Sequence, residues 1–192
     1  MPFDKDRDGF MMTEGSATLI LEEMTSAQSR GAHIYGEILG SGSNADAHHI
    51  TAPSPGGNGA LRCMQLAIED AGLAPSDIAS VNAHGTSTPL NDAAEAEALS
   101  KLFGDNGPPV TSTKGVTGHA LGAAGALEAT AVLLSFAHKS IPPTAGHATA
   151  DPEMAAFNLV SGSPQAWEPG PSLSNSFGFG GHNGSIVISP VQ

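Results

Sequence analysis

The sequence predicts an α/β protein, because short apolar runs alternate with helical patterns and each run ends at a polar turn. Two of these switches organise the chain: residues 81–89 (Val-Asn-Ala-His-Gly-Thr-Ser-Thr-Pro) and residues 113–125 (Thr-Lys-Gly-Val-Thr-Gly-His-Ala-Leu-Gly-Ala-Ala-Gly). Strand-to-helix switches are where α/β proteins place ligands and catalytic groups. The two histidines, one lysine and several hydroxyls of these turns therefore form a candidate catalytic site.

Composition narrows the possible function classes. A chain of 192 residues and 19.3 kDa is expected to form one domain, and 40% hydrophobic residues with only 5% aromatic residues predict an aliphatic core. The net charge of −12, from 19 acidic and 7 basic residues, argues against binding to nucleic acid or to an anionic membrane surface. No apolar run reaches the ~20 residues that span a bilayer. The N-terminus lacks a signal-peptide pattern, and the single Cys63 excludes an internal disulfide framework, so a reducing cytoplasm is expected.

The first half of the chain contains two predicted strands and two helical patterns. Residues 15–23 and 33–42 read as strands, and residues 25–30 are compatible with a helix. A longer helix is expected to end at Gly72, and its apolar face consists of Leu61, Met64, Ile68 and Ala71. Cys63 lies in this helix, off the apolar face and away from a helix N-terminus or a base. It is therefore interpreted as a bystander rather than a nucleophile.

The second half continues the alternation. Residues 78–83 form a predicted strand that ends at His84, and the next helix is expected to open at Asp92 as N-cap, with Glu95 completing a capping box. A short strand over residues 110–113 precedes a helix over residues 120–138 that is apolar nearly all round, which predicts burial in the domain or at an interface.

The remainder of the chain is expected to be β structure and loops. Residues 157–160 could form a short edge strand. Residues 172–176 and 185–189 read as two strands joined by a glycine-rich bend. Glycine lets such a bend approach a ligand closely, but this is not a dinucleotide-binding fingerprint because no helix follows it.

Two short motifs resemble metal sites only weakly. Asp4, Asp6 and Asp8 have the spacing of a calcium loop, but no helix precedes them and the intervening Lys5 and Arg7 favour a salt-bridged turn. The adjacent histidines 48 and 49 would point to opposite faces of a strand, and no further zinc ligand lies at a familiar spacing. No metal site is predicted.

The histidines of the two turns have complementary positions. His84 ends a strand, and His119 lies where a helix begins, so the positive end of the helix should keep its imidazole neutral and able to donate to an oxyanion. The alternative is that each histidine only satisfies local backbone groups. Glu128 is the one acid of the 120–138 helix, and Lys114 is its expected partner, because an unpaired buried carboxylate is costly.

Four segments resemble one enzyme family over nearly the whole chain. They are residues 2–10 (Pro-Phe-Asp-Lys-Asp-Arg-Asp-Gly-Phe), residues 82–89 (Asn-Ala-His-Gly-Thr-Ser-Thr-Pro), residues 112–125 with their lysine and second histidine, and residues 175–181 (Asn-Ser-Phe-Gly-Phe-Gly-Gly). In this order they are similar to the β-ketoacyl-acyl-carrier-protein synthases of the KAS I/II type, the condensing enzymes of fatty-acid synthesis.

The resemblance implies a role for each matching residue. His84 and His119 would promote decarboxylation of a malonyl thioester and stabilise the oxyanions of a Claisen condensation, while Lys114 would set the electrostatics of the site. Glu128 would be a structural acid beside that lysine. Thr86 and Thr88 would bind the phosphopantetheine arm. Phe177 would be a gate whose N–H contributes to the oxyanion hole, and Phe179 would belong to the same substrate-binding bend. No metal or organic cofactor is implied, since phosphopantetheine arrives on the carrier protein.

The resemblance also implies that the chain is half of a larger unit. The family's nucleophilic cysteine lies in a first half that this sequence lacks, so the chain alone is expected to be inactive in condensation. The implied fold is thiolase-like: a C-terminal βαβαβαββ half of a five-layer αβαβα architecture. Residues 1–30 would be the end of the N-terminal half, and residues 31–192 the C-terminal domain.

The implied partners are the acyl carrier protein, the missing N-terminal half and a second copy in a homodimer. Two alternatives stay open at this point. The chain could be half of a polyketide-type ketosynthase, with the same chemistry on another substrate. It could instead be a non-catalytic subunit that pairs with a cysteine-bearing chain, although such a subunit would not need both histidines and Lys114.

Overall fold

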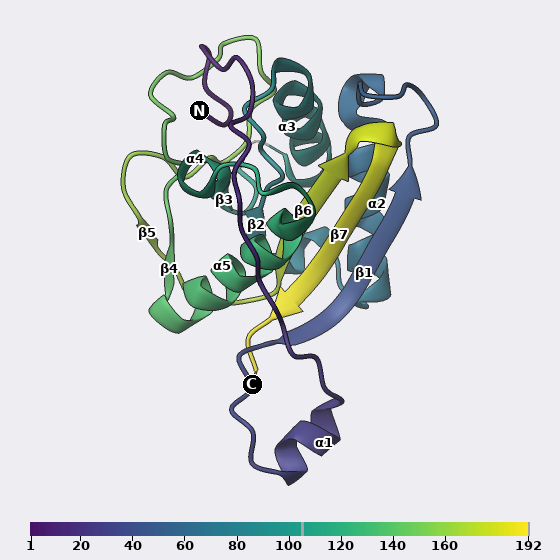
Figure 1. The fold of residues 1–192 in the computed structure, drawn as a ribbon, viewed down its shortest axis with the longest axis vertical. Helices are drawn as coiled ribbons and strands as arrows, with labels where there is room; N and C mark the ends of the chain where they lie inside the picture. Colours follow the sequence, from purple (N-terminus) through teal and green to yellow (C-terminus); the bar gives the residue numbers. More distant parts are fainter. Residues whose placement is uncertain (105, 192) are drawn as a thin grey trace.

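A mixed five-stranded sheet forms the centre of the molecule (Figure 1). The computed structural model describes residues 1–104 and 106–191, and the sheet has the order β1-β7-β6-β2-β3. Its strands are β1 (Glu37–Ala45), β2 (Ser80–Asn82), β3 (Val110–Thr111), β6 (Ser172–Gly178) and β7 (His182–Ser189). β2 is parallel to β3 and β6, whereas β7 is antiparallel to both β6 and β1.

Helices cover both faces of this sheet. α2 (Asn58–Asp70) and α3 (Pro89–Phe103) lie on one face, and α5 (Ala124–His138) lies on the other (Figure 1). Residues of β7 show the division: Val187 packs with the cluster under α2 and α3, whereas its neighbours Ile186 and Ile188 pack against α5. The chain order β1, α2, β2, α3, β3, α5, β6, β7 is the predicted βαβαβαββ order, so the predicted thiolase-like half is confirmed.

The remaining elements are short. α1 (Met24–Ser29) lies in a loop that projects from the body, α4 (Lys114–Thr117) follows β3, and β4 (Ser140–Ile141) pairs with β5 (Gln165–Ala166). The predicted edge strand at residues 157–160 is reduced to a single bridge between Leu159 and Val110. The predicted C-terminal pair of strands is confirmed as the β6–β7 hairpin.

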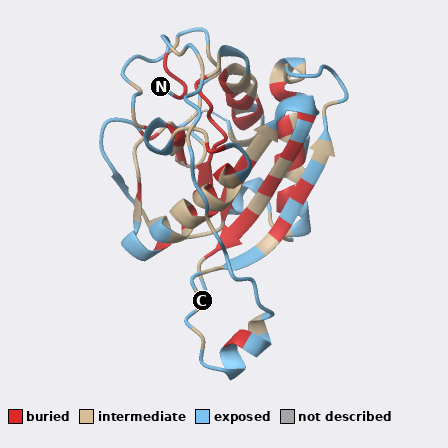
Figure 2. Cartoon of the chain, in the orientation of Figure 1, coloured by how far each residue is buried: buried red, intermediate tan, exposed pale blue. Residues whose placement is uncertain are grey.

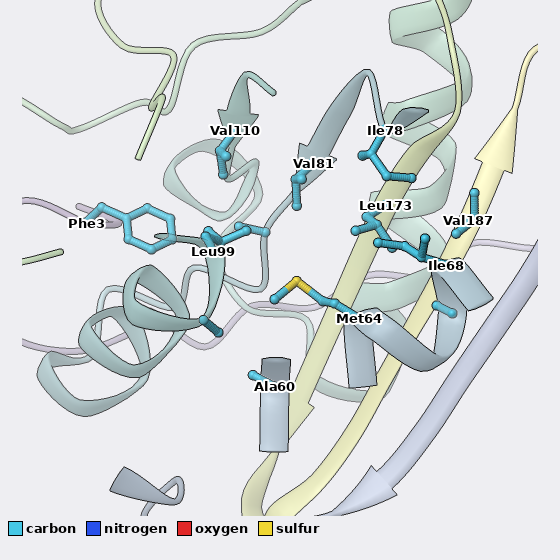
Figure 3. Close-up of a cluster of buried hydrophobic side chains, with 13 residues drawn as sticks. Phe3, Ala60, Met64, Ile68, Ile78, Val81, Leu99, Val110, Leu173 and Val187 are labelled. Carbon is cyan, nitrogen blue, oxygen red and sulfur yellow. The ribbon is translucent and has the colours of Figure 1, made fainter. Parts of the chain in front are cut away.

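The main core lies between the sheet and the helices α2 and α3. Figure 3 shows Met64 and Ile68 of α2 among side chains of the central strands, including Leu173 of β6. Phe3, from the start of the chain, is 1% exposed and joins the same cluster. Along β7 and β1, buried residues alternate with more exposed ones, the pattern of strands with two different faces (Figure 2).

α2 packs directly on β1 because β1 carries glycine where the two elements meet. A Cβ at Gly42 would overlap the carbonyl oxygen of Cys63, and one at Gly40 would overlap the α2 backbone at Ala71. The predicted position of Cys63 off the apolar face is therefore wrong: its side chain is 0% exposed and its thiol donates to the Gly42 carbonyl oxygen at 3.3 Å. The buried face of α2 therefore includes Cys63 as well as the large apolar residues, because Gly42 leaves room for its small side chain.

The predicted strand over residues 15–23 is wrong. This segment has no strand pairing, and Ile20 and Leu21 are 85% and 71% exposed. Its composition suits a strand, but a strand forms only where a neighbouring strand offers hydrogen bonds, and none of the described residues does so here. The predicted division of the chain at residue 30 stays a prediction.

The apolar helix of residues 120–138 begins later than expected. α5 starts at Ala124, after a 3₁₀ turn at Leu121–Ala123. At Gly125 the helix comes close to β6, because a Cβ there would lie 3.3 Å from Ser176 Oγ. The 18 residues Leu121–His138 are, by length and composition alone, apolar enough to cross a membrane, and 28% of them are buried. One such stretch is weak support for a membrane span, and its buried Glu128 side packs towards β6.

Candidate active site

The two histidine turns meet at one end of the sheet. His84 follows β2 and Lys114 follows β3, and these strands are parallel neighbours, so both chain segments leave the sheet at the same edge. The rings of His84 and His119 are 5.4 Å apart at an angle of 83°. The structure therefore confirms that the two turns converge.

Lys114 is the buried cation of the site. Its ammonium group donates to the carbonyl oxygen of His84 at 2.5 Å, forms an ion pair with Glu128, and lies 3.3 Å from His84 Nδ1. The side chains of Lys114 and Glu128 are 3% and 2% exposed, so this pair is almost completely removed from water. Burial raises the pKa of Glu128, and the charge of Lys114 offsets part of that effect. The predicted pairing of Lys114 with Glu128 is present.

The contact with Lys114 determines where His84 carries its proton. An ammonium group has no acceptor, so His84 Nδ1 must be the acceptor in this contact, and the ring hydrogen lies on Nε2. Burial, the charge of Lys114 and the neighbouring His119 together hold the pKa of His84 well below its ordinary value. His84 is thus a neutral imidazole with a single N–H donor.

His119 reaches the same state by a different contact. The backbone N–H of Leu121 donates to His119 Nδ1 at 3.2 Å, which leaves the ring hydrogen on Nε2. Leu121 itself has a φ of 50°, a left-handed conformation outside the range of a right-handed α-helix. Burial and then the charge of Lys114 lower the pKa of His119. A neutral imidazole was predicted from a helix N-terminus, but burial and the lysine are its causes.

A buried carboxylate that the sequence assigned to another role supports His84. Glu95 accepts hydrogen bonds from the backbone N–H groups of His84 and Gly85, at 2.9 and 2.8 Å, and from the amide of Asn175 at 3.2 Å. The predicted capping-box role of Glu95 is wrong, because α3 begins at Pro89 and its N-cap is Thr88. Glu95 therefore lies in the second turn of α3, where it faces the histidine turn.

Asp92 is likewise not the predicted N-cap. It lies within the first turn of α3, and its carboxylate accepts from the N–H of Phe3 at 2.7 Å and from the N–H of Ser87 at 3.1 Å. Ser87 has a φ of 68° in the turn between Thr86 and Thr88. The carboxylate thus joins the start of the chain to the turn that holds the predicted substrate-binding threonines.

A cleft of about 800 Å³ opens over the histidines. Thr86 and Thr88 line it with their hydroxyl oxygens 2.9 Å apart, and the Phe177 ring lies 6.1 Å from the His84 ring. Phe179 also lines the cleft, but it is 66% exposed at the mouth. All eight residues predicted for the site lie in or directly behind this cleft: His84, His119, Lys114, Thr86, Thr88, Phe177, Phe179 and Glu128.

Cys63 lies outside the site. It lines none of this cleft, and burial raises the pKa of its thiol to about 11, so it is protonated at neutral pH. Within the described ranges, no group of three or more histidine, cysteine or acidic side chains is placed to hold a metal ion. The Asp4 carboxylate of the first candidate loop accepts three backbone N–H bonds, from Asp6, Ala148 and Thr149.

The sheet order is that of a thiolase-like α/β fold, and the two histidine turns meet at one end of its sheet. The family described as "Beta-ketoacyl synthase, C-terminal domain" matches residues 35–148. The chain belongs to this beta-ketoacyl synthase family.

Similar proteins share the whole length of this chain. A 3-oxoacyl-[acyl-carrier-protein] synthase 2 from Synechocystis sp. is 48% identical over all of the chain, which corresponds to 46% of that relative. The structure of a beta-ketoacyl synthase from Burkholderia phymatum is 43% identical with a TM-score of 0.96, and the chain covers 46% of it. The structure of a type II PKS acyl-carrier protein in complex with its ketosynthase contains a similar chain, which is 37% identical with a TM-score of 0.95. This chain covers 47% of it. The chain spans about half the length of the curated relatives it matches.

Proposed function

We propose that this chain is the histidine-bearing half of a 3-oxoacyl-[acyl-carrier-protein] synthase of fatty-acid elongation. The observation that carries the proposal is the contact at Nδ1 of each ring, with Lys114 and with the Leu121 N–H, which assigns both ring hydrogens to Nε2 and gives one cleft two neutral donors. Two such donors suit an oxyanion that forms on a thioester carbonyl.

The reaction proceeds in two steps, decarboxylation and condensation. The C–C bond to the carboxylate of a malonyl thioester breaks, CO2 leaves, and the electron pair passes into an enolate whose oxygen receives both Nε2–H bonds. The enolate carbon then attacks the carbonyl of an acyl group held as a thioester on cysteine. The tetrahedral intermediate expels the cysteine thiolate, which takes up one proton, and a 3-oxoacyl thioester remains on the carrier.

The roles of the surrounding residues follow from their positions. Lys114, held by Glu128, keeps His84 from accepting a proton at Nδ1. Thr86 and Thr88 would bind the phosphopantetheine arm along the cleft wall, and the bend carrying Phe177 and Phe179 would close over it. The nucleophilic cysteine must come from another half, because Cys63 is buried and protonated. The substrate is carried by an acyl carrier protein, the working unit is a homodimer, and its compartment is the cytoplasm.

Two measurements test this proposal. The first is the intact mass of the native gene product: a species about twice 19.3 kDa identifies a protein that contains both halves, whereas a species of 19.3 kDa requires a separate cysteine-bearing chain. The second is malonyl-carrier-protein decarboxylation and condensation by the complete enzyme, with this chain alone as the control. Condensation by the complete enzyme only is expected. A complete enzyme that neither decarboxylates nor condenses contradicts the proposal.

A polyketide-type ketosynthase remains the second candidate function. It is favoured by the TM-score of 0.95 with the PKS ketosynthase complex, although that identity is 37% against 48% for the fatty-acid synthase relative. Offering saturated acyl primers and poly-β-ketoacyl primers to the complete enzyme in parallel separates the two. Preference for the poly-β-ketoacyl primer assigns the chain to the polyketide branch.

A further inference from the structure

One short segment contacts both histidine turns. It consists of residues 9–13 (Gly-Phe-Met-Met-Thr), here called the strap. At its start, the Gly9 N–H donates to the Ser87 carbonyl oxygen at 2.9 Å, which ties it to the first turn. At its end it pairs with His119, so the strap spans the gap between the two turns from outside the sheet (Figure 1).

The strap holds the backbone of His119 on both sides. The His119 N–H donates to the Met11 carbonyl oxygen at 2.8 Å, and the Thr13 N–H donates to the His119 carbonyl oxygen at 3.1 Å. The Thr13 hydroxyl also donates to the carbonyl oxygen of Thr117 at 2.9 Å. Gly118 has room for this approach only because it lacks a Cβ, which would overlap the Thr13 methyl group.

The strap also contacts the His119 ring. The Phe10 ring lies 5.1 Å from it at 65°, an edge-to-face arrangement, and both rings line the cleft. The start of the strap is fixed in turn, because the nearby Phe3 is buried in the core and its N–H donates to Asp92. A segment anchored at one end and bonded to both turns restricts their relative movement.

We infer that the strap is a positioning element that sets the spacing of His84 and His119, with Thr13 and Phe10 as positioning residues. The inference rests on the proposed function, since it is the shared oxyanion that requires the two Nε2–H donors at a fixed separation. Misplacement of a catalytic group by 1 Å can cost about 100-fold in rate. The strap hydrogen-bonds to Ser87, Thr117 and His119 rather than to Thr86 or Thr88, so its loss should lower kcat more than it raises KM.

The test compares pairs of variants in the complete enzyme, with malonyl-carrier protein as the substrate. Thr13→Pro removes the N–H that donates to His119, whereas the conservative variant Thr13→Val keeps it. Phe10→Leu removes the edge-to-face contact, whereas Phe10→Tyr keeps an aromatic ring. We expect kcat for decarboxylation to fall at least ~10-fold in Thr13→Pro and several-fold in Phe10→Leu, with KM nearly constant. Both conservative variants should retain most of the rate.

Equal rates within each pair, in folded proteins, would overturn the inference. If Thr13→Pro does not fold, the Phe10 pair decides alone. The ¹⁵N resonances of the His119 ring, recorded on the same proteins, report its environment independently of turnover: we expect them to move in Phe10→Leu and to stay close to wild type in Phe10→Tyr. An inactive wild-type enzyme contradicts the proposed function, whereas an active one whose variants match it in rate and resonance contradicts only the strap.

Discussion

At the scale of single residues, the chemistry of the site depends on which ring nitrogens carry hydrogen. Lys114 and the Leu121 N–H occupy the two Nδ1 atoms, so His84 and His119 are donors only through Nε2. Neither histidine needs to gain or lose a proton to stabilise an oxyanion. The low pKa of each ring keeps it in this neutral state throughout the neutral pH range.

Removing one donor should therefore be costly. His84→Ala is expected to lower malonyl decarboxylation by the complete enzyme at least ~100-fold, the scale measured for loss of one oxyanion-hole donor. His138→Ala, which removes an exposed imidazole at the far end of α5, serves as the matched control. Steady-state release of CO2 measures both. Unchanged turnover in His84→Ala would refute the role assigned to this histidine.

The buried Glu95 should make stability depend on pH. Burial raises its pKa from the ordinary 4.5 to about 7, so between these values the folded state holds a proton that the unfolded state has lost. The free energy of unfolding must then fall as pH rises through this window. Glu95→Gln carries no titrating group, so urea unfolding at about pH 5 and about pH 8 should show a smaller difference than in wild type. If the free energy of unfolding changes equally with pH in the two proteins, Glu95 is not the group that causes the change.

The sequence predicted which side chains the two turns bring together, but not the carboxylate that holds the His84 turn or the segment that contacts His119. His84, His119, Lys114 and Glu128 follow from turn positions and from the cost of a lone buried acid. Glu95 was given a local role because its spacing from Asp92 imitates a capping box. Its actual partners depend on how α3 packs beneath the β2 turn. The contact of Phe10 with His119 leaves no signal in the sequence, because it joins segments that only the fold brings together.

At the scale of elements, the contact of α2 with β1 depends on glycine. Gly42→Ala would place a methyl group against the carbonyl oxygen of Cys63, and such overpacking typically costs about 1–3 kcal/mol. Gly122→Ala is the matched control, because a Cβ there meets no atom within 4 Å. Urea denaturation should show a lower free energy of unfolding for the first variant and little change for the second. Equal stability of the two variants would mean that α2 shifts without cost.

Elements were predictable where their signals are local. The end of α2 just before Gly72 was predictable because glycine readily takes a positive φ, as Gly72 does. The predicted strand over residues 15–23 is wrong because a strand also needs a neighbouring strand to pair with, which residue propensity does not indicate. The predicted start of the last helix at residue 120 is wrong because Leu121 takes a left-handed conformation, and α5 begins only at Ala124.

At the scale of the whole molecule, the excess of negative charge dominates. Four of the exposed basic side chains are already in ion pairs with acids: Arg30, Arg62, Lys101 and Lys139. With 19 acidic and 7 basic residues, the net charge of −12 is an excess of acidic groups that ion pairs cannot remove, and their mutual repulsion opposes the compact state.

Salt should therefore stabilise the protein. Screening shortens the reach of each charge to ~10 Å at 0.1 M ionic strength and less above that. Raising NaCl from about 0.05 to about 0.5 M should increase Tm, because the exposed ion pairs that salt weakens contribute little. Differential scanning fluorimetry, with sucrose as an uncharged additive for comparison, gives the result. A Tm that falls with NaCl would show that the ion pairs outweigh the repulsion.

The pairing of β1 with β7 restricts how the sheet can be assembled. β1 is the first strand of the sheet in sequence and β7 the last, and within residues 1–104 and 106–191 only β7 hydrogen-bonds to β1. On the ribosome, β1 and the helix that covers it must wait for β7 before their edge of the sheet can close. Contacts of such long sequence separation slow folding and leave apolar surface exposed meanwhile. The nascent chain should therefore depend on chaperones until translation of this segment is complete.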